Sequence, residues 1–144
     1  MTQIKYKNIA TELQSNVFNL INNAYGSSYN VMDGMPAGLW SGRGFPYVLV
    51  HTPEVSDEKI TQTKWRMTAT LTIEIVSPQE STVRIIYDEI RNLLKTNQTA
   101  TRGKNAFLYR NARSAISSVF IPGKQRVNRV WNMKMEVEYV VTST

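Results

Sequence analysis

The sequence contains no cysteine and a single histidine, His51, among its 144 residues. Disulfides, thiolate nucleophiles and cysteine-ligated zinc are therefore excluded, and a metal site would have to consist almost wholly of carboxylates. No apolar run approaches the roughly 18 residues that span a bilayer, and the first residues lack the apolar core of a signal peptide. We expect a protein of a reducing or virion-like environment, neither secreted through a cleaved leader nor embedded in a membrane.

A recognisable catalytic apparatus is also missing. A Ser–His pair would need His51, which lies beside Pro53 at the end of a short apolar segment, where a structural role is the stronger interpretation. The glycines between Gly34 and Gly44 lack the Gly-Lys-Ser/Thr ending of a phosphate-binding loop. We predict that the protein is not an enzyme and has no catalytic, cofactor-binding or metal-binding residues.

Three acidic residues leave one enzymatic alternative open. Glu74, Glu136 and Glu138 lie on the polar faces of two predicted strands, and they would converge if those strands were neighbours. A carboxylate-dependent nuclease that uses magnesium needs such a cluster. Because Arg66 and Lys134 lie on the same faces, the favoured interpretation is an exposed sheet face on which these two basic residues pair with the acids.

The net charge of +6 is unevenly distributed along the chain. Residues Met1 to Thr63 include four basic and five acidic side chains, whereas residues Ile90 to Met135 include ten basic side chains and no acidic one. Such a segment carries a positive field that neighbouring acids do not cancel locally. It indicates either a solvated basic surface or a surface that faces an acidic protein or DNA. The candidate residues are Arg102, Lys104, Arg110, Arg113, Lys124, Arg126 and Arg129.

Hydrophobic periodicity predicts two amphipathic helices. The first runs from about Lys5 to Asn23, with a stripe of apolar residues at helical spacing: Ile9, Leu13, Val17, Leu20 and Ala24. The second follows the sequence Ser-Pro-Gln-Glu, which is typical of a helix start. There the Ser77 hydroxyl would accept a hydrogen bond from the Glu80 amide, and the helix would continue to about Thr96.

Alternation of apolar and polar residues predicts strands. The pattern is strict over residues 65–75 and 131–141, and a short apolar strand is expected at Tyr47 to His51. The segment Phe107 to Ile121 is less regular, and we expect a strand there only from about Ala115. The fold class is α+β: an antiparallel or mixed sheet with two amphipathic helices packed on one face, in a single domain of residues 1–144.

A long loop is predicted between Asp33 and Pro46, because four glycines and two prolines interrupt this stretch. It also contains large apolar side chains, which either fold back over the edge of the core or dock on a neighbouring subunit. The candidate residues for a subunit or partner interface are Leu39, Trp40, Arg43 and Phe45.

The order of these features resembles the tail terminator (tail completion) proteins of tailed bacteriophages. The features are an amphipathic helix, a Gly/Pro-rich loop, the segment Phe-Pro-Tyr-Val-Leu-Val, a long strand, a capped helix with Tyr-Asp-Glu-Ile-Arg, and a long C-terminal strand. The resemblance implies a structural virion protein of the tail or neck, assembled in the host cytoplasm. It would form a homo-oligomeric ring, usually a hexamer, that caps the tail tube. Its partners would be the tail tube protein and the head–tail connector protein, with DNA passing through non-specifically.

Two other functions remain as alternatives. A head–tail connector or neck protein would show the same kind of sequence pattern. A small non-specific nucleic-acid-binding protein would use the basic residues between Arg102 and Arg129 as its footprint.

Overall fold

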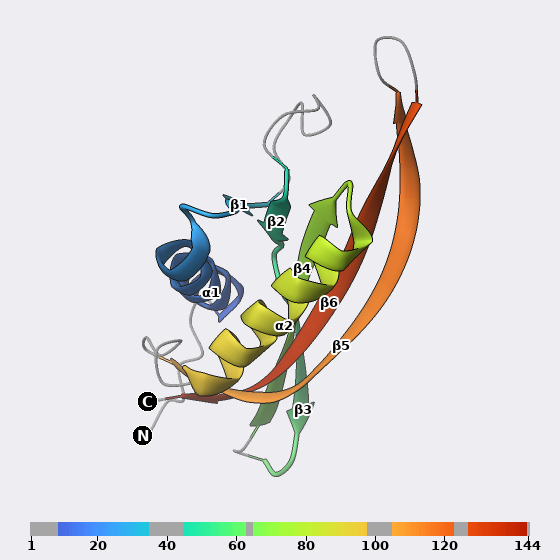
Figure 1. Cartoon of the computed structure of the whole chain (residues 1–144). Coiled ribbons are helices and arrows are strands. Elements are labelled where there is room, and N and C mark those ends of the chain that lie inside the picture. The colour runs from blue at the N-terminus through green and yellow to red at the C-terminus, as the bar shows by residue number, and fades with distance from the viewer. Residues whose placement is uncertain (1–8, 35–44, 63–64, 98–104, 123–126, 144) are drawn as a thin grey trace.

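The computed structural model describes residues 9–34, 45–62, 65–97, 105–122 and 127–143. They form two helices and one six-stranded mixed sheet (Figure 1). In chain order the elements are α1 (Ile9–Tyr25), β1 (Asn30–Asp33), β2 (Tyr47–Val50), β3 (Glu54–Lys59), β4 (Trp65–Ser77), α2 (Glu80–Thr96), β5 (Asn105–Pro122) and β6 (Val127–Ser143). The predicted α+β class is confirmed.

The sheet has the strand order β1-β2-β4-β6-β5. Strand β3 also pairs with β4, on the side of β4 that faces away from β6, so β2 and β3 cover successive parts of one β4 edge. All pairings are antiparallel except that of β1 with β2. Strands β4 and β6 are therefore central, whereas β3 and β5 lie at opposite edges.

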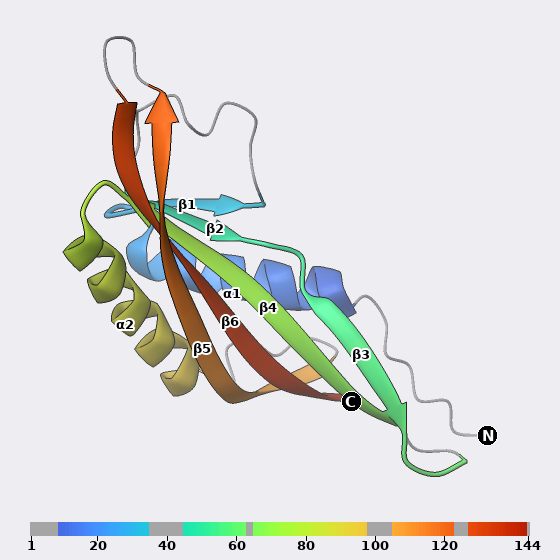
Figure 2. The same ribbon diagram turned by 90° about the vertical axis from the view of Figure 1, so that its right-hand side faces the viewer.

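Both helices pack on one face of this sheet (Figures 1 and 2). The strict alternation in β4 and β6 places their apolar residues on that face, where they meet the apolar stripes of α1 and α2. The buried apolar residues of the two strands on this face are Ala69, Leu71, Ile73, Ile75, Met133, Met135, Val137, Tyr139 and Val141. The face opposite the helices, called the open face below, is mostly polar.

The helices differ from prediction in detail. In α1 the buried stripe passes through Ile21, whereas Leu20 is half-buried and Ala24 is exposed. The expected capping box before α2 was wrong. Ser77 is still the last residue of β4, so the N-cap is Gln79, two residues beyond the expected cap. The Ser77 hydroxyl accepts a hydrogen bond from the Gln79 amide at 3.2 Å. The predicted end at Thr96 is confirmed.

The edge strands were not fully predicted. Strand β3 was not expected, because all six of its residues are exposed and no apolar alternation marks it. Strand β5 begins ten residues before the expected Ala115. A register shift between Tyr109 and Asn111 interrupts its alternation, and most of residues 110–118 are exposed on both faces. The outer ends of β5 and β6 extend past the end of β4 as a two-stranded ribbon (Figure 2).

Candidate functional site

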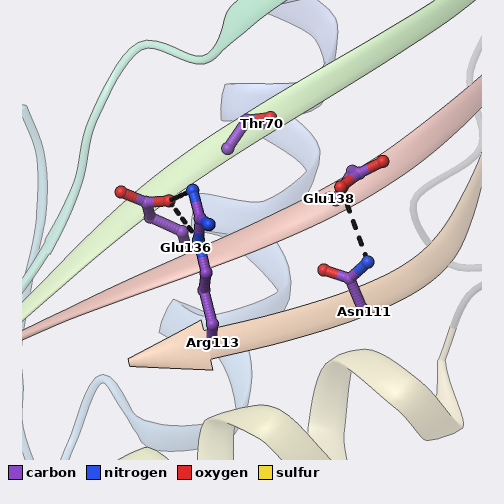
Figure 3. A pocket seen from close by; sticks show the side chains of 5 residues that line it. All are labelled: Thr70, Asn111, Arg113, Glu136 and Glu138. Atoms are coloured by element: carbon purple, nitrogen blue, oxygen red, sulfur yellow. Dashed lines mark hydrogen bonds and ion pairs between the residues drawn. The ribbon is translucent and has the colours of Figure 1, made fainter. Parts of the chain in front are cut away.

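The open face carries a row of polar side chains from β4, β6 and β5. Thr70, Asn111, Arg113, Glu136 and Glu138 line a shallow hollow there (Figure 3). Register places them together, because Thr70 is opposite Glu138, which in turn is opposite Asn111 on β5. Alternation along each strand turns their side chains away from the helices.

Each glutamate in this hollow has a basic partner on β5. Arg113 contacts Glu136 through Nη2 at 2.6 Å, and its Nε donates to the same oxygen at 2.7 Å. Arg110 Nη1 lies 3.0 Å from Glu138 Oε1. The Arg113 side chain is 80% exposed, so solvent screens the pair and its contribution to stability is small.

The third acid, Glu74, belongs to a separate and more buried cluster between β2, β4 and β6. Its Oε1 lies 3.0 Å from His51 Nε2, and its Oε2 accepts a hydrogen bond from Asn132 Nδ2 at 2.9 Å. The His51 contact has the distance of an ion pair but does not have the geometry of a hydrogen bond. Glu74 and Asn132 are buried, so each would lose a partner in a low-dielectric site if the other were removed.

The structure therefore does not bring the three predicted acids into one metal site. Within the described residues no group of three or more His, Asp or Glu side chains could hold a metal ion. The expected pairing was also wrong in its partners: the acids contact Arg113, Arg110 and His51 instead of Arg66 and Lys134. The reason is register, because β5 lies beside β6 along its whole length and presents its arginines directly to the glutamates.

The basic candidate residues are only partly described. Arg110 and Arg113 are neutralised locally by glutamates of β6, so the expectation of an uncompensated positive field was wrong for these two residues. The Arg129 guanidinium lies over the Trp131 ring, 5.8 Å from its centroid. Arg102, Lys104, Lys124 and Arg126 lie outside the described residues.

Of the loop candidates, Phe45 alone is described, and Leu39, Trp40 and Arg43 lie outside the described residues. Phe45 is half-buried and packs edge-on against Tyr47, with ring centroids 4.8 Å apart. Both rings belong to a small apolar cluster on the open face, formed with Leu49, Val76 and Val130. For Phe45, the structure thus favours folding back onto its own chain.

Exposed aliphatic side chains mark the feature that the sequence did not reveal. Five large hydrophobic residues of the described chain are between 38% and 55% exposed: Val55, Ile60, Ile85, Leu108 and Ile116. All but Ile85 lie on or directly beside β3 and β5, which are at opposite edges of the sheet. An isolated exposed aliphatic residue has little meaning, but four of these five residues gather at the β3 and β5 edges of the sheet.

Comparisons with known proteins agree with this architecture. No protein-family model matches the chain, and no curated protein matches it in sequence. Solved structures with this fold include a chain from the virion of a native gene transfer agent (GTA) particle, which is 15% identical, with a TM-score of 0.63 over 95% of this chain and 99% of that chain. They also include the gp17 protein of bacteriophage SPP1, which is 12% identical, with a TM-score of 0.56 over 100% and 97% of the two chains. At these identities the likeness establishes a shared fold.

None of the described helices is both long enough and apolar enough to cross a membrane.

Proposed function

We propose that this chain is a structural protein of a phage-like virion and acts as the tail terminator. A homo-oligomeric ring of it would cap the tail tube and present a surface to the head–tail connector. The observation that carries the proposal is the fold match over nearly the full length of both chains to a component of a GTA virion and to a bacteriophage protein. The order of elements that suggested the family from sequence is supported by an independent comparison of three-dimensional structure.

The open face supports a binding role. Its acids are paired with basic side chains, and in the described part of the chain they do not gather into a metal-binding group. Such a surface suits the binding of other virion proteins. The chain would then act by binding and not by catalysing a reaction. The chain would act as one domain, with DNA passing through the ring without sequence-specific contacts. The loop residues Leu39, Trp40 and Arg43 stay candidate partner contacts.

The role of terminator is tested by removing the gene and imaging the particles. A terminator stops tube growth, so its loss should give tubes of uncontrolled length that carry no heads, and supplying the protein in trans should restore normal particles. A head–tail connector is the second candidate. Its loss should leave tails of normal length that are detached from filled heads. That result would replace the terminator assignment while keeping a structural role in the virion.

Particles with intact, infectious tails in the absence of the gene would contradict both roles.

A mixing experiment tests where the chain binds the tail. Purified chain should bind the open end of isolated tail tubes and should not bind the sides of those tubes. A variant that is unable to self-associate should lose this binding, because a ring presents several copies of the contact at once.

A further inference from the structure

Strands β3 and β5, at opposite edges of the sheet, differ in the sign of their own charged side chains, although Arg110 and Arg113 of β5 are already paired with Glu138 and Glu136 of β6. Strand β3 contains Glu54, Asp57 and Glu58 with a single basic residue, Lys59, and all six of its residues are exposed. Strand β5 contains Arg110 and Arg113 and no acidic residue over its 18 positions. Within the described residues β3 pairs only with β4, and β5 pairs only with β6, so each strand has one edge without a strand partner.

Charges on an edge strand often protect it against pairing with other chains. Here the charges of β3 and β5 would favour some pairings between copies over others. Two β3 edges would place acids against acids, and two β5 edges would place arginines against arginines. A β3 edge against a β5 edge places opposite charges together. Favourable pairing is therefore restricted to unlike edges, which gives a head-to-tail contact.

The two edges also fit in direction. Because β3, β4, β6 and β5 are each antiparallel to the next, β3 and β5 run in opposite directions at the two sides of one sheet. A second copy rotated about an axis parallel to the strands keeps all strand directions. Its β3 would meet β5 of the first copy in the antiparallel orientation, with both helix layers on the same face of a continuous sheet.

We propose that copies of this chain join by antiparallel addition of β3 of one copy to residues 112–117 of β5 of the next. In this register Val55 lies opposite Ile116, and Glu58 lies opposite Arg113. Val55 and Ile116 both belong to the helix-covered face, since their partners within the chain are Ala69 and Met133 of the core.

Glu58 and Arg113 both belong to the open face, where their partners within the chain are Arg66 and Glu136. One register thus pairs two exposed aliphatic side chains on one face, and opposite charges on the other. The paired stretch of β5 begins just beyond the register shift at Tyr109 and Asn111. Arg113 uses Nε and Nη2 for Glu136, and an arginine has five N–H donors, so a second carboxylate can be accommodated.

The edge pairing rests on the proposed ring and is the contact between neighbouring copies in it. Head-to-tail contacts build closed rings when the rotation between copies closes. The contact differs from the loop residues predicted from sequence, and it buries Val55 and Ile116, which are 38% and 40% exposed in the isolated chain.

The absence of cysteine allows a direct test. The double variant Val55→Cys/Ile116→Cys places two thiols opposite each other between copies, at a Cα separation that a disulfide can bridge, about 4.4–6.8 Å. Mild oxidation should give a ladder of covalent multimers on a non-reducing gel, and reduction should abolish it. Each single variant should give at most dimers. The matched control Val55→Cys/Ile85→Cys, with its second thiol on the exposed face of α2, should give no ladder.

Charge reversal tests the register independently. Glu58→Arg and Arg113→Glu should each weaken self-association by about tenfold or more, since like charges then face each other. The double variant should recover most of the association. Arg84→Glu on α2 is the control for net charge and should have little effect. Loss of the Arg113–Glu136 pair cannot explain a recovery, because the double variant also lacks it.

The outcomes separate this inference from the proposed function. If the wild-type chain assembles but the first cysteine pair gives no ladder, or the double charge variant stays dissociated, the edge pairing is wrong and the virion role stands. A chain that remains monomeric and forms no ladder also overturns the edge pairing. The tail phenotype of a gene deletion decides the virion role separately.

Discussion

The central strands β4 and β6 differ from the edge strands β3 and β5 in what covers their side chains. Strands β4 and β6 alternate strictly between apolar and polar residues, and their apolar sides are completed by the helices of the same chain. Strands β3 and β5 carry exposed aliphatic and charged residues that nothing in the described chain covers on their outer edges. The comparison separates residues that fold the chain from residues that, in the proposed assembly, join neighbouring copies.

The largest expected effect contrasts the same substitution in the two regions. Ile73→Ala in β4 should lower the free energy of unfolding by about 2–5 kcal/mol, because it leaves a cavity in a fully buried site. Ile116→Ala in β5 should change it by about 0.5 kcal/mol or less, since that side chain is exposed. Urea unfolding at low protein concentration measures both. Equal losses would mean that β5 is part of the folding core and would erase the distinction.

A second contrast concerns the polar residues of the open face. Glu74→Ala should lower the free energy of unfolding by about 1–3 kcal/mol, because it leaves the buried Asn132 amide without its acceptor. Glu138→Ala, the control, should cost about 1 kcal/mol or less, since Arg110 becomes solvated instead. Thermal unfolding of the two variants side by side is sufficient. A larger loss for Glu138 would show that the surface pairs dominate.

A third prediction concerns a tyrosine in the core. Tyr139 is fully buried and packs edge-on against Phe107 and Tyr109, and its hydroxyl has no hydrogen-bond partner among the residues that the structure describes. Burial raises the pKa of this tyrosine well above its usual value. Tyr139→Phe should therefore raise the free energy of unfolding by about 1 kcal/mol, because an unsatisfied buried hydroxyl is removed. A lower free energy of unfolding for this variant would indicate that a buried water forms a hydrogen bond with the Tyr139 hydroxyl.

The smallest expected effect is a pH dependence at alkaline pH. Tyr29 donates a hydrogen bond to Glu89 Oε2 at 2.8 Å and so ties the segment before β1 to α2. Burial, and then the hydrogen bond to Glu89, raises the pKa of Tyr29 to about 12 from an ordinary value of 10.0. The unfolded state thus loses its proton first.

The stabilisation from Tyr29 is present below pH 10 and is lost as the pH rises towards 12. Melting temperatures recorded across this interval should fall less steeply for Tyr29→Phe than for the wild-type chain. Parallel curves of melting temperature against pH would mean that Glu89 does not affect the ionisation of the Tyr29 hydroxyl in the folded state.

The sequence predicted the central part of the molecule because burial imposes a pattern. Alternation in β4 and β6 gave the buried faces, and helical spacing gave α2 and the stripe of α1. Strand β3 could not be predicted, since six exposed residues have no alternation to read. In β5 the irregular register near Asn111 and the exposure of the following residues removed the period.

The candidate site was predicted less well than the fold. The polar face of β4 and β6 was expected, but the arginines that neutralise it were assigned to the wrong strands, because the extent of β5 was unknown. Local sequence also placed the cap of α2 two residues too early, since tertiary pairing held Ser77 in the strand. Contacts between distant segments were the information that local patterns lacked.

Native mass spectrometry of the purified wild-type chain tests the central claim most directly. We predict one discrete closed assembly, a hexamer of the 16.4 kDa subunit, that dissociates in the Glu58→Arg variant and reforms in Glu58→Arg/Arg113→Glu. A wild-type chain that stays monomeric at high concentration, or an assembly indifferent to both charge changes, would contradict the account.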